Sequence, residues 1–206
     1  MYMIKNIIFD VGRVLVSWQP QETMRKLGMT ETDIEAVSDA LFTSGLWNET
    51  DRGVQPDEEI LKQFIERAPK QEKNIRLFWN NLDVAITQFD YVISWMKALK
   101  KAGYRLYILS NYGKWTYDST KDNGLSFLSE VDGALFSYEV KLIKPDLEIY
   151  RTLLRKFDLK PEECVFMDDL EANIKGAQAV GINGIVFKNQ KDAIEQLKKY
   201  GVTCEM

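Results

Sequence analysis

The sequence of 206 residues has no histidine and only two cysteines, Cys164 and Cys204. The lack of histidine excludes Ser–His–Asp catalysis, Cys–His catalysis and His-ligated zinc. Two cysteines do not suggest a disulfide framework, so we expect a reducing, cytoplasmic location. Any chemistry must therefore depend on carboxylates, hydroxyls, amines or a hard metal ion.

Long apolar runs and basic blocks are also missing. No run approaches the ~20 apolar residues of a membrane span, and residues 1–12 lead into a strand-like segment without the features of a signal peptide. Lys and Arg number 27 against 31 Asp and Glu, a net charge of −4, which argues against nucleic acid as the main partner. We expect a globular protein that binds neither nucleic acid nor membrane, as a monomer or small homo-oligomer.

Five short apolar runs, several of them apolar on both faces, predict a buried parallel sheet. They span residues 4–9, 104–109, 133–136, 163–167 and 184–187. Helical patterns cover residues 89–102, 146–157, 170–180 and 192–200. This alternation predicts an α/β domain with right-handed crossovers.

One connection is much longer than a crossover helix needs, since roughly ninety residues separate the first two runs. Residues 30–42 and 57–67 each carry an apolar stripe at helical spacing. We therefore predict a helical cap subdomain at residues 16–86, inserted into a core of residues 1–15 and 87–206. Residues 44–53 are the most polar and loop-like part of the insert.

Small polar or acidic residues follow three of the apolar runs. Asp10 follows the first, Ser110 and Asn111 follow the second, and Asp168 and Asp169 follow the fourth. Ligands of an open parallel sheet bind beyond the carboxyl ends of its strands. Taken singly, each residue is more often a turn or capping residue, so the hypothesis of a site depends on their combination.

These residues, with Lys144, occur in four segments: FDVGRVL (residues 9–15), YILSN (107–111), IKPDLEIY (143–150) and VFMDDLEANIKGA (165–177). In this order they resemble the motifs of the haloacid dehalogenase-like hydrolase superfamily, and the resemblance covers essentially the whole chain. The first segment is similar to the branch of glucose-1-phosphatases and epoxide hydrolase N-terminal phosphatases. The resemblance implies a Rossmann-like three-layer sandwich with a central parallel sheet and a helical cap. It also implies a phosphatase of small phosphorylated metabolites.

The resemblance further implies a role for each motif residue. Asp10 would be the nucleophile that forms an aspartyl-phosphate. Ser110 and the backbone N–H of Asn111 would hold phosphoryl oxygens, and Lys144 would neutralise charge on Asp10 and on the phosphate. The implied Mg²⁺ ligands are Asp10, the Gly12 carbonyl, Asp168 (directly or through a water) and Asp169.

Gly12 departs from the family pattern. Most phosphatases of the superfamily have there a second Asp, which protonates the leaving alkoxide and then activates water. Three explanations are open: substrates with good leaving groups such as sugar 1-phosphates, a proton from another group or a metal-bound water, or a catalytically weak ligand-binding or regulatory protein.

A 2-haloacid dehalogenase is a further alternative, because it shares the Asp nucleophile but uses no metal. Asp168 and Asp169 disfavour it, since carboxylates close to Asp10 repel one another without a cation.

Three more residues are candidates for substrate specificity. Arg13 follows the first motif and either binds substrate or forms a surface ion pair. Trp47 either stacks on a sugar face or packs in the cap core. Arg52 either meets a second anionic group or pairs with a local carboxylate.

Overall fold

The computed structural model describes residues 3–205. Its larger part is built on a five-stranded sheet with the order β5-β4-β1-β6-β7, in which all neighbouring strands run parallel. The strands are β1 (Asn6–Phe9), β4 (Arg105–Ser110), β5 (Gly133–Phe136), β6 (Cys164–Asp168) and β7 (Asn183–Val186). The predicted α/β fold with a central parallel sheet is confirmed.

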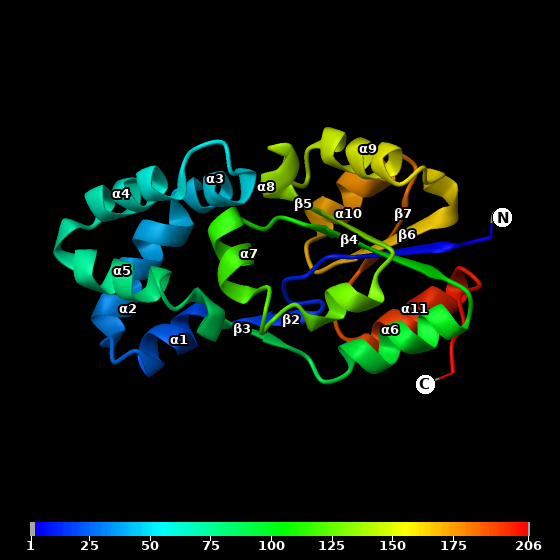
Figure 1. The fold of residues 1–206 in the computed structure, drawn as a ribbon, viewed down its shortest axis with the longest axis horizontal. Helices are drawn as coiled ribbons and strands as arrows, with labels where there is room; N and C mark the ends of the chain where they lie inside the picture. Colours follow the sequence, from blue (N-terminus) through cyan, green and yellow to red (C-terminus); the bar gives the residue numbers. More distant parts are fainter. Residues whose placement is uncertain (1–2, 206) are drawn as a thin grey trace.

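Helices cover both faces of this sheet (Figure 1). One face carries α6 (Val92–Lys101) and α11 (Gln190–Lys199), and the other carries α9 (Leu147–Lys156) and α10 (Glu171–Gln178). Because side chains alternate along a strand, Ile7 and Phe9 pack against the first helical layer and Ile8 against the second. All three are fully buried, so the strand is fixed between two hydrophobic layers.

The core also contains four shorter helical segments. Two of them, α7 (Lys114–Thr120) and α8 (Ser137–Val140), follow β4 and β5 at the carboxyl end of the sheet, whereas the 3-10 turns η4 (Ser126–Glu130) and η5 (Pro161–Glu163) precede β5 and β6. Both α7 and α8 follow a strand directly or after a short loop, which places them beside the helical part of the molecule (Figure 1).

The smaller part consists of helices from one continuous segment. They are α1 (Pro20–Lys26), α2 (Glu31–Ser38), the π-helix η1 (Asp39–Thr43), α3 (Leu46–Arg52), α4 (Asp57–Arg67), η2 (Pro69–Gln71), α5 (Glu72–Trp79) and η3 (Leu82–Ala85). They enclose a hydrophobic cluster of their own, with Phe64 and Phe78 at full burial. We refer to this part as the cap.

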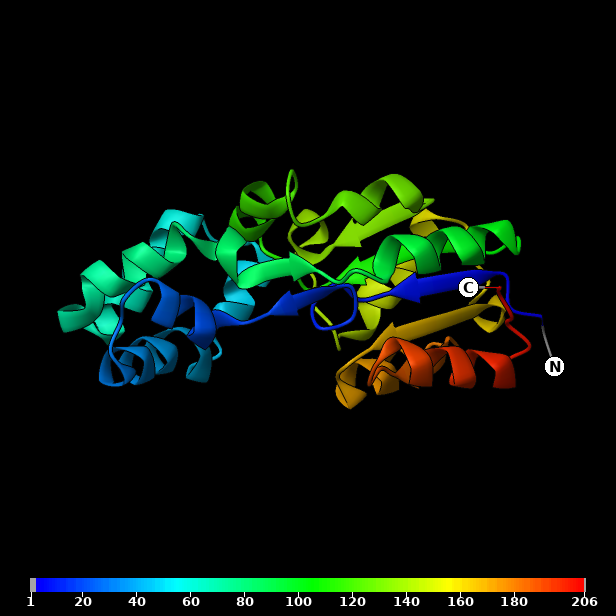
Figure 2. The same ribbon diagram turned by 90° about the horizontal axis from the view of Figure 1, so that it is seen from below.

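Two short strands join the cap to the core (Figure 2). The chain enters the cap through β2 (Val16–Trp18) and leaves it through β3 (Ile86–Gln88), and these strands pair antiparallel. The pairing ties the two connections together, so the cap is joined to the core by a ribbon of two adjacent strands.

The loop predicted at residues 44–53 is wrong, because most of that segment forms α3. The glycines that flank this helix both have positive φ, 75° at Gly45 and 65° at Gly53. Such φ values are readily adopted by glycine and disfavoured for other residues. Two glycines at this spacing therefore bound a short helix within a polar segment.

Side chains and backbone groups fasten the cap over the core. Trp115 of α7 stacks on Trp79 with ring centroids 5.9 Å apart, and its Nε1 donates to the Trp79 carbonyl over 3.0 Å. The hydroxyl of Ser137, at the start of α8, donates to the backbone carbonyl of Asp51. The first of these contacts holds α5 against α7, and the second holds the C-terminal turn of α3 against the carboxyl end of the sheet.

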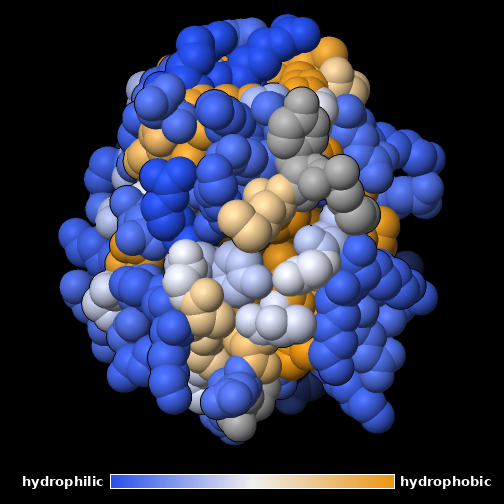
Figure 3. Space-filling view, turned by 90° about the vertical axis from the view of Figure 1, so that its right-hand side faces the viewer, coloured by the Kyte–Doolittle hydropathy of each residue, from blue (hydrophilic) through white to orange (hydrophobic). Residues whose placement is uncertain are grey.

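The opposite end of the core, seen in Figure 3, is mostly hydrophilic around its rim, with less polar residues gathered near its centre. Among residues 3–205, no helix combines the length and apolar character that crossing a membrane requires.

Candidate active site

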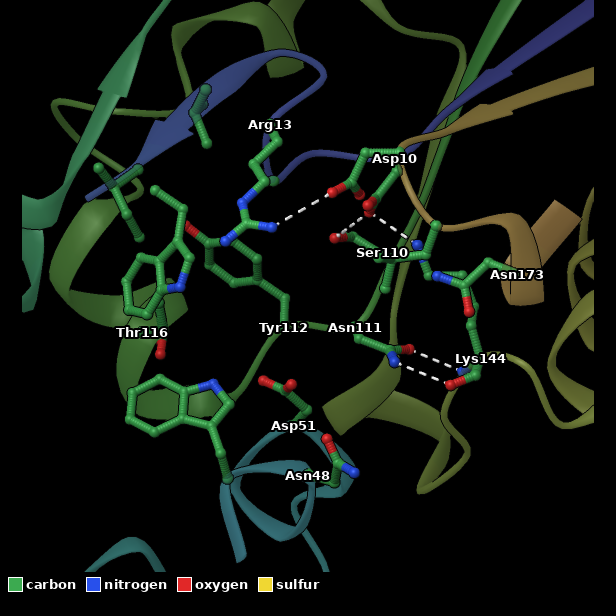
Figure 4. Close-up of a pocket in the computed structure, with 17 residues that line it drawn as sticks. Asp10, Arg13, Asn48, Asp51, Ser110, Asn111, Tyr112, Thr116, Lys144 and Asn173 are labelled. Atoms are coloured by element: carbon green, nitrogen blue, oxygen red, sulfur yellow. Dashed lines mark hydrogen bonds and ion pairs between the residues drawn. The ribbon is translucent and has the colours of Figure 1, made fainter. Parts of the chain in front are cut away.

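A cavity of about 300 Å³ lies between the carboxyl ends of the strands and the cap. This volume is at the lower end for small-molecule sites. The core contributes Asp10, Ser110, Lys144 and Asp169 to its lining, and the cap contributes Asn48 and Asp51 (Figure 4). The residues predicted at three different strand ends thus meet at one site.

Lys144 bridges two carboxylates inside this site. Its Nζ lies 2.7 Å from Asp10 Oδ1 and 2.7 Å from Asp168 Oδ2. Burial by itself lowers the pKa of Lys144, but the charges of Asp10 and Asp168 outweigh that effect and raise it. Ser110 Oγ also donates to Asp10 Oδ1 over 2.7 Å, so a cation and a hydroxyl both fix the predicted nucleophile.

Asp168 is completely buried and surrounded by donors. The Nδ2 of Asn173 lies 3.0 Å from both carboxylate oxygens, and the Leu170 N–H donates to Oδ1 over 2.8 Å. With Lys144 on Oδ2, both oxygens already accept hydrogen bonds from the protein. The arrangement makes Asp168 well suited to hold Lys144 in place.

The side chain of Asn111 holds Lys144 from the other direction. Its Oδ1 accepts from the Lys144 backbone N–H over 2.7 Å, and its Nδ2 donates to the Lys144 carbonyl over 3.0 Å (Figure 4). This pair of hydrogen bonds joins the end of β4 to the loop that carries the lysine. The amide group of Asn111 is therefore engaged with backbone rather than free in the cavity.

Asp10, Asp168 and Asp169 form an acidic cluster, since one oxygen of each lies within 4.8 Å of the others. Burial raises the pKa of Asp10 to about 6, with Lys144 opposing the shift and Asp168 adding to it. Burial, followed by the charge of Asp168, also raises the pKa of Asp169. Lys144 pairs with Asp10 and Asp168, and Arg13 lies 3.6 Å from Asp169, so two cations face three carboxylates. An oxygen-only donor set suits Mg²⁺. Gly12 borders the same cavity.

The three candidates for substrate specificity lie in different surroundings. Arg13 borders the cavity and its Nη1 is 3.6 Å from Asp169 Oδ2. Trp47 borders the cavity and also packs on Trp18, with ring centroids 5.6 Å apart. Arg52 is not among the cavity residues; its side chain pairs with Glu49 and with Asp146, both over 3.5 Å.

Sequence reasoning missed Asp51 and Asn173. Asp51 lies one helical turn after Trp47, so the two side chains project from the same face of α3, whereas Arg52 projects from another. That spacing is a usable signal only once the segment is known to be helical. Asn173 lies at the start of α10 and contacts Asp168 within the same motif, a contact that the strand-end argument did not consider.

The family model for haloacid dehalogenase-like hydrolases matches residues 4–181. The chain belongs to the haloacid dehalogenase-like hydrolase family, as its four motifs predicted. It is 26% identical to D-ribitol-5-phosphate phosphatase of Bacteroides thetaiotaomicron over an alignment of 209 positions. The alignment covers 95% of this chain and 97% of that protein. It is also 26% identical to a sesquiterpene phosphatase of Aspergillus oryzae over 186 residues, 88% of each chain.

A solved structure supports the same relationship. It is a haloacid dehalogenase family enzyme from Bacteroides thetaiotaomicron in complex with magnesium and inorganic phosphate, 25% identical to this chain. The two structures align with a TM-score of 0.72 over 91% of this chain and 96% of that chain. The prediction of a hydrolase of this family with phosphatase relatives is confirmed.

Proposed function

We propose that this protein is a Mg²⁺-dependent phosphatase of small phosphorylated metabolites, which acts by transferring the phosphoryl group to Asp10. The observation that carries the proposal is the meeting of Asp10, Ser110, Lys144 and Asp169 in one cavity at the carboxyl end of the sheet. A carboxylate nucleophile, phosphate-binding donors and a cation site are the parts that phosphoryl transfer requires. Two relatives with phosphatase activities on unlike substrates support the general reaction class.

Three side chains would have distinct roles in phosphoryl transfer. Asp10 attacks phosphorus, and Lys144, held between Asp10 and Asp168, offsets the charge that develops on the phosphoryl oxygens. The hydroxyl of Ser110 turns from Asp10 to a phosphoryl oxygen when substrate binds.

The residues fit Mg²⁺, with Asp10, Asp169 and the Gly12 carbonyl as direct ligands and Asp168 acting through Lys144 or a water. When bound, the ion would supply positive charge that offsets the repulsion of the Asp10 carboxylate and the dianionic phosphate.

The cavity favours a substrate that presents an apolar or flat face beside its phosphate. Trp18, Trp47 and Tyr112 line one part of the cavity, and Asn48 adds a polar group from the cap. A sugar ring has both an apolar face and hydroxyl groups, so we propose sugar phosphates, sugar 1-phosphates among them, as the first substrates to test.

The dehalogenase alternative remains disfavoured by charge. Removal of halide from a haloacid uses a carboxylate nucleophile without a cation, yet Asp10 here is grouped with Asp168 and Asp169. The buried Lys144 and the more exposed Arg13 do not balance the charge of three carboxylates and an anionic substrate. Phosphate chemistry with a divalent cation accounts for this charge arrangement.

Phosphate release from a panel of phosphorylated metabolites, measured with Mg²⁺ and with EDTA, tests the proposal. We expect turnover that requires Mg²⁺ and that falls below detection in Asp10→Asn, because the amide cannot act as the nucleophile. Asp90→Asn is a matched control, since Asp90 is exposed and does not border the cavity. Equal turnover in EDTA, or an active Asp10→Asn variant, would contradict the mechanism.

A further inference from the structure

The position that normally supplies a proton in this family holds no side chain here. Gly12 lies two residues after Asp10, and a Cβ built at Gly12 would meet no other atom within 4 Å. The space beside the nucleophile is therefore open. An alkoxide is a poor leaving group, so hydrolysis of an alkyl phosphate benefits from an acid close to the leaving oxygen.

Most ionisable groups that border the cavity are already committed. Asp10 is the nucleophile, Lys144 bridges two carboxylates, and Asp169 lies in the acidic cluster beside Arg13. The phenol of Tyr112 is buried and hydrogen-bonded to the Thr120 hydroxyl at 2.9 Å, and burial raises its pKa. Among the described lining residues, Asp51 is the carboxyl group that none of these roles uses.

The docking of α3 on the core directs Asp51 into the cavity (Figure 4). Its backbone carbonyl accepts from Ser137 Oγ, which in turn accepts from the Tyr112 N–H over 2.8 Å. A Cβ at Gly113 would lie 2.8 Å from the Thr50 carbonyl oxygen, so glycine permits this close approach of core and cap.

The surroundings of Asp51 suit proton exchange near neutral pH. Burial, followed by the negative charge of Asp10, raises the pKa of Asp51 to about 7, while Lys144 and Gly113 oppose the shift. A carboxyl group in this range can both donate and accept a proton.

We propose that Asp51, supplied by the cap, is the general acid and base of the phosphatase reaction in place of the side chain missing at Gly12. This inference rests on the proposed function. It implies that catalysis requires the cap to be docked, because the acid and the nucleophile come from different parts of the molecule.

The proposed steps balance as follows. Asp10 attacks phosphorus, the bond from phosphorus to the leaving oxygen breaks, and that oxygen takes its proton from the Asp51 carboxyl group. The Asp51 carboxylate then takes a proton from a water molecule whose oxygen attacks the phosphorus of the aspartyl-phosphate. The bond between phosphorus and Asp10 breaks, which releases hydrogen phosphate. Asp10 is then again a carboxylate, and Asp51 is again a protonated carboxyl group.

A leaving-group comparison tests Asp51 directly. In Asp51→Asn, kcat/KM for an alkyl phosphate should fall by ~10²–10⁴-fold, the usual contribution of acid–base catalysis. p-Nitrophenyl phosphate needs no acid, so its first turnover should stay within ~10-fold of wild type, because only protonation of the leaving group is lost. A burst of one p-nitrophenol per enzyme should then give way to slow turnover, since the base for the second step is missing.

Two further variants separate chemistry from structure. Glu49→Gln removes a carboxylate from the same helix outside the cavity and should keep wild-type kinetics. Gly12→Asp added to Asp51→Asn should restore alkyl phosphate hydrolysis at least ~10-fold, since the open space at Gly12 admits a carboxyl group close to the leaving oxygen.

The outcomes distinguish this inference from the proposed function. A wild-type protein with no Mg²⁺-dependent turnover overturns both. An active wild type whose Asp51→Asn variant keeps its alkyl phosphate activity overturns the role of Asp51 alone. An equal loss of the first turnover on both kinds of substrate, with no rescue by Gly12→Asp, assigns Asp51 a structural role and also overturns the inference.

Discussion

Replacing Lys144 with methionine should destabilise the protein strongly. The substitution removes a cation that lies 2.7 Å from both Asp10 and Asp168, at a site where the lysine is 3% exposed. Breaking a buried ion pair by removing one partner costs about 3–5 kcal/mol. For a chain of this size, each kcal/mol lowers Tm by about 2–4 °C, so we expect a decrease of about 6–20 °C.

Thermal and urea unfolding in EDTA measure this effect without a bound cation. Lys175→Met is the matched control, since the Lys175 side chain is 70% exposed and pairs with Glu171 across one helical turn. Its change in the free energy of unfolding should stay within about 0.5 kcal/mol. The double variant Lys144→Met with Asp168→Asn should be more stable than Lys144→Met, because it also removes a stranded carboxylate. A loss below about 1 kcal/mol for Lys144→Met would refute the view that these carboxylates depend on the lysine.

Three other predictions concern the cation, pH and packing. Mg²⁺ at 100 times Kd should add about 2.7 kcal/mol to the free energy of unfolding of the wild type and so raise its Tm. The increase should be much smaller in Asp169→Asn, and equal increases would contradict the ligand assignment. Since the pKa of Asp51 rises from 3.8 to about 7 on folding, the folded protein holds a proton that the unfolded chain has released between those pH values. The free energy of unfolding of the metal-free protein should therefore fall as pH rises across this interval, and the raised pKa of Asp10 acts in the same direction. When the free energy of unfolding from urea titrations is plotted against pH, Asp51→Asn should show a less steep decrease than the wild type. Gly133→Ala should cost about 1–3 kcal/mol in urea unfolding, because its Cβ would lie 2.4 Å from Phe157 Cε1; an unchanged midpoint would show that the ring moves freely.

Much of the core could be predicted because its signals are local. Short runs that are apolar on both faces of a strand indicated buried strands. The polar residues after these runs indicated the edge of the sheet at which the site lies, since parallel strands of one sheet end at the same edge. Helices such as α9 followed from an apolar stripe at helical spacing. The same kind of signal failed for residues 44–53, where polar composition concealed a short helix bounded by two glycines.

The amino-acid sequence by itself determined the family, the strand ends that carry Asp10, Ser110 and Asp169, and the absence of an acid at Gly12, because residue order and local periodicity carry that information. Only the tertiary structure decided the strand order and the position of Lys144 between two carboxylates. It also decided that the side chain of Asn111 forms two hydrogen bonds with the backbone of Lys144. It also decided that Asp51, rather than Arg52, borders the cavity. These features depend on contacts between residues far apart in the chain, and the direction of a side chain on α3 is fixed by how that helix packs on the core.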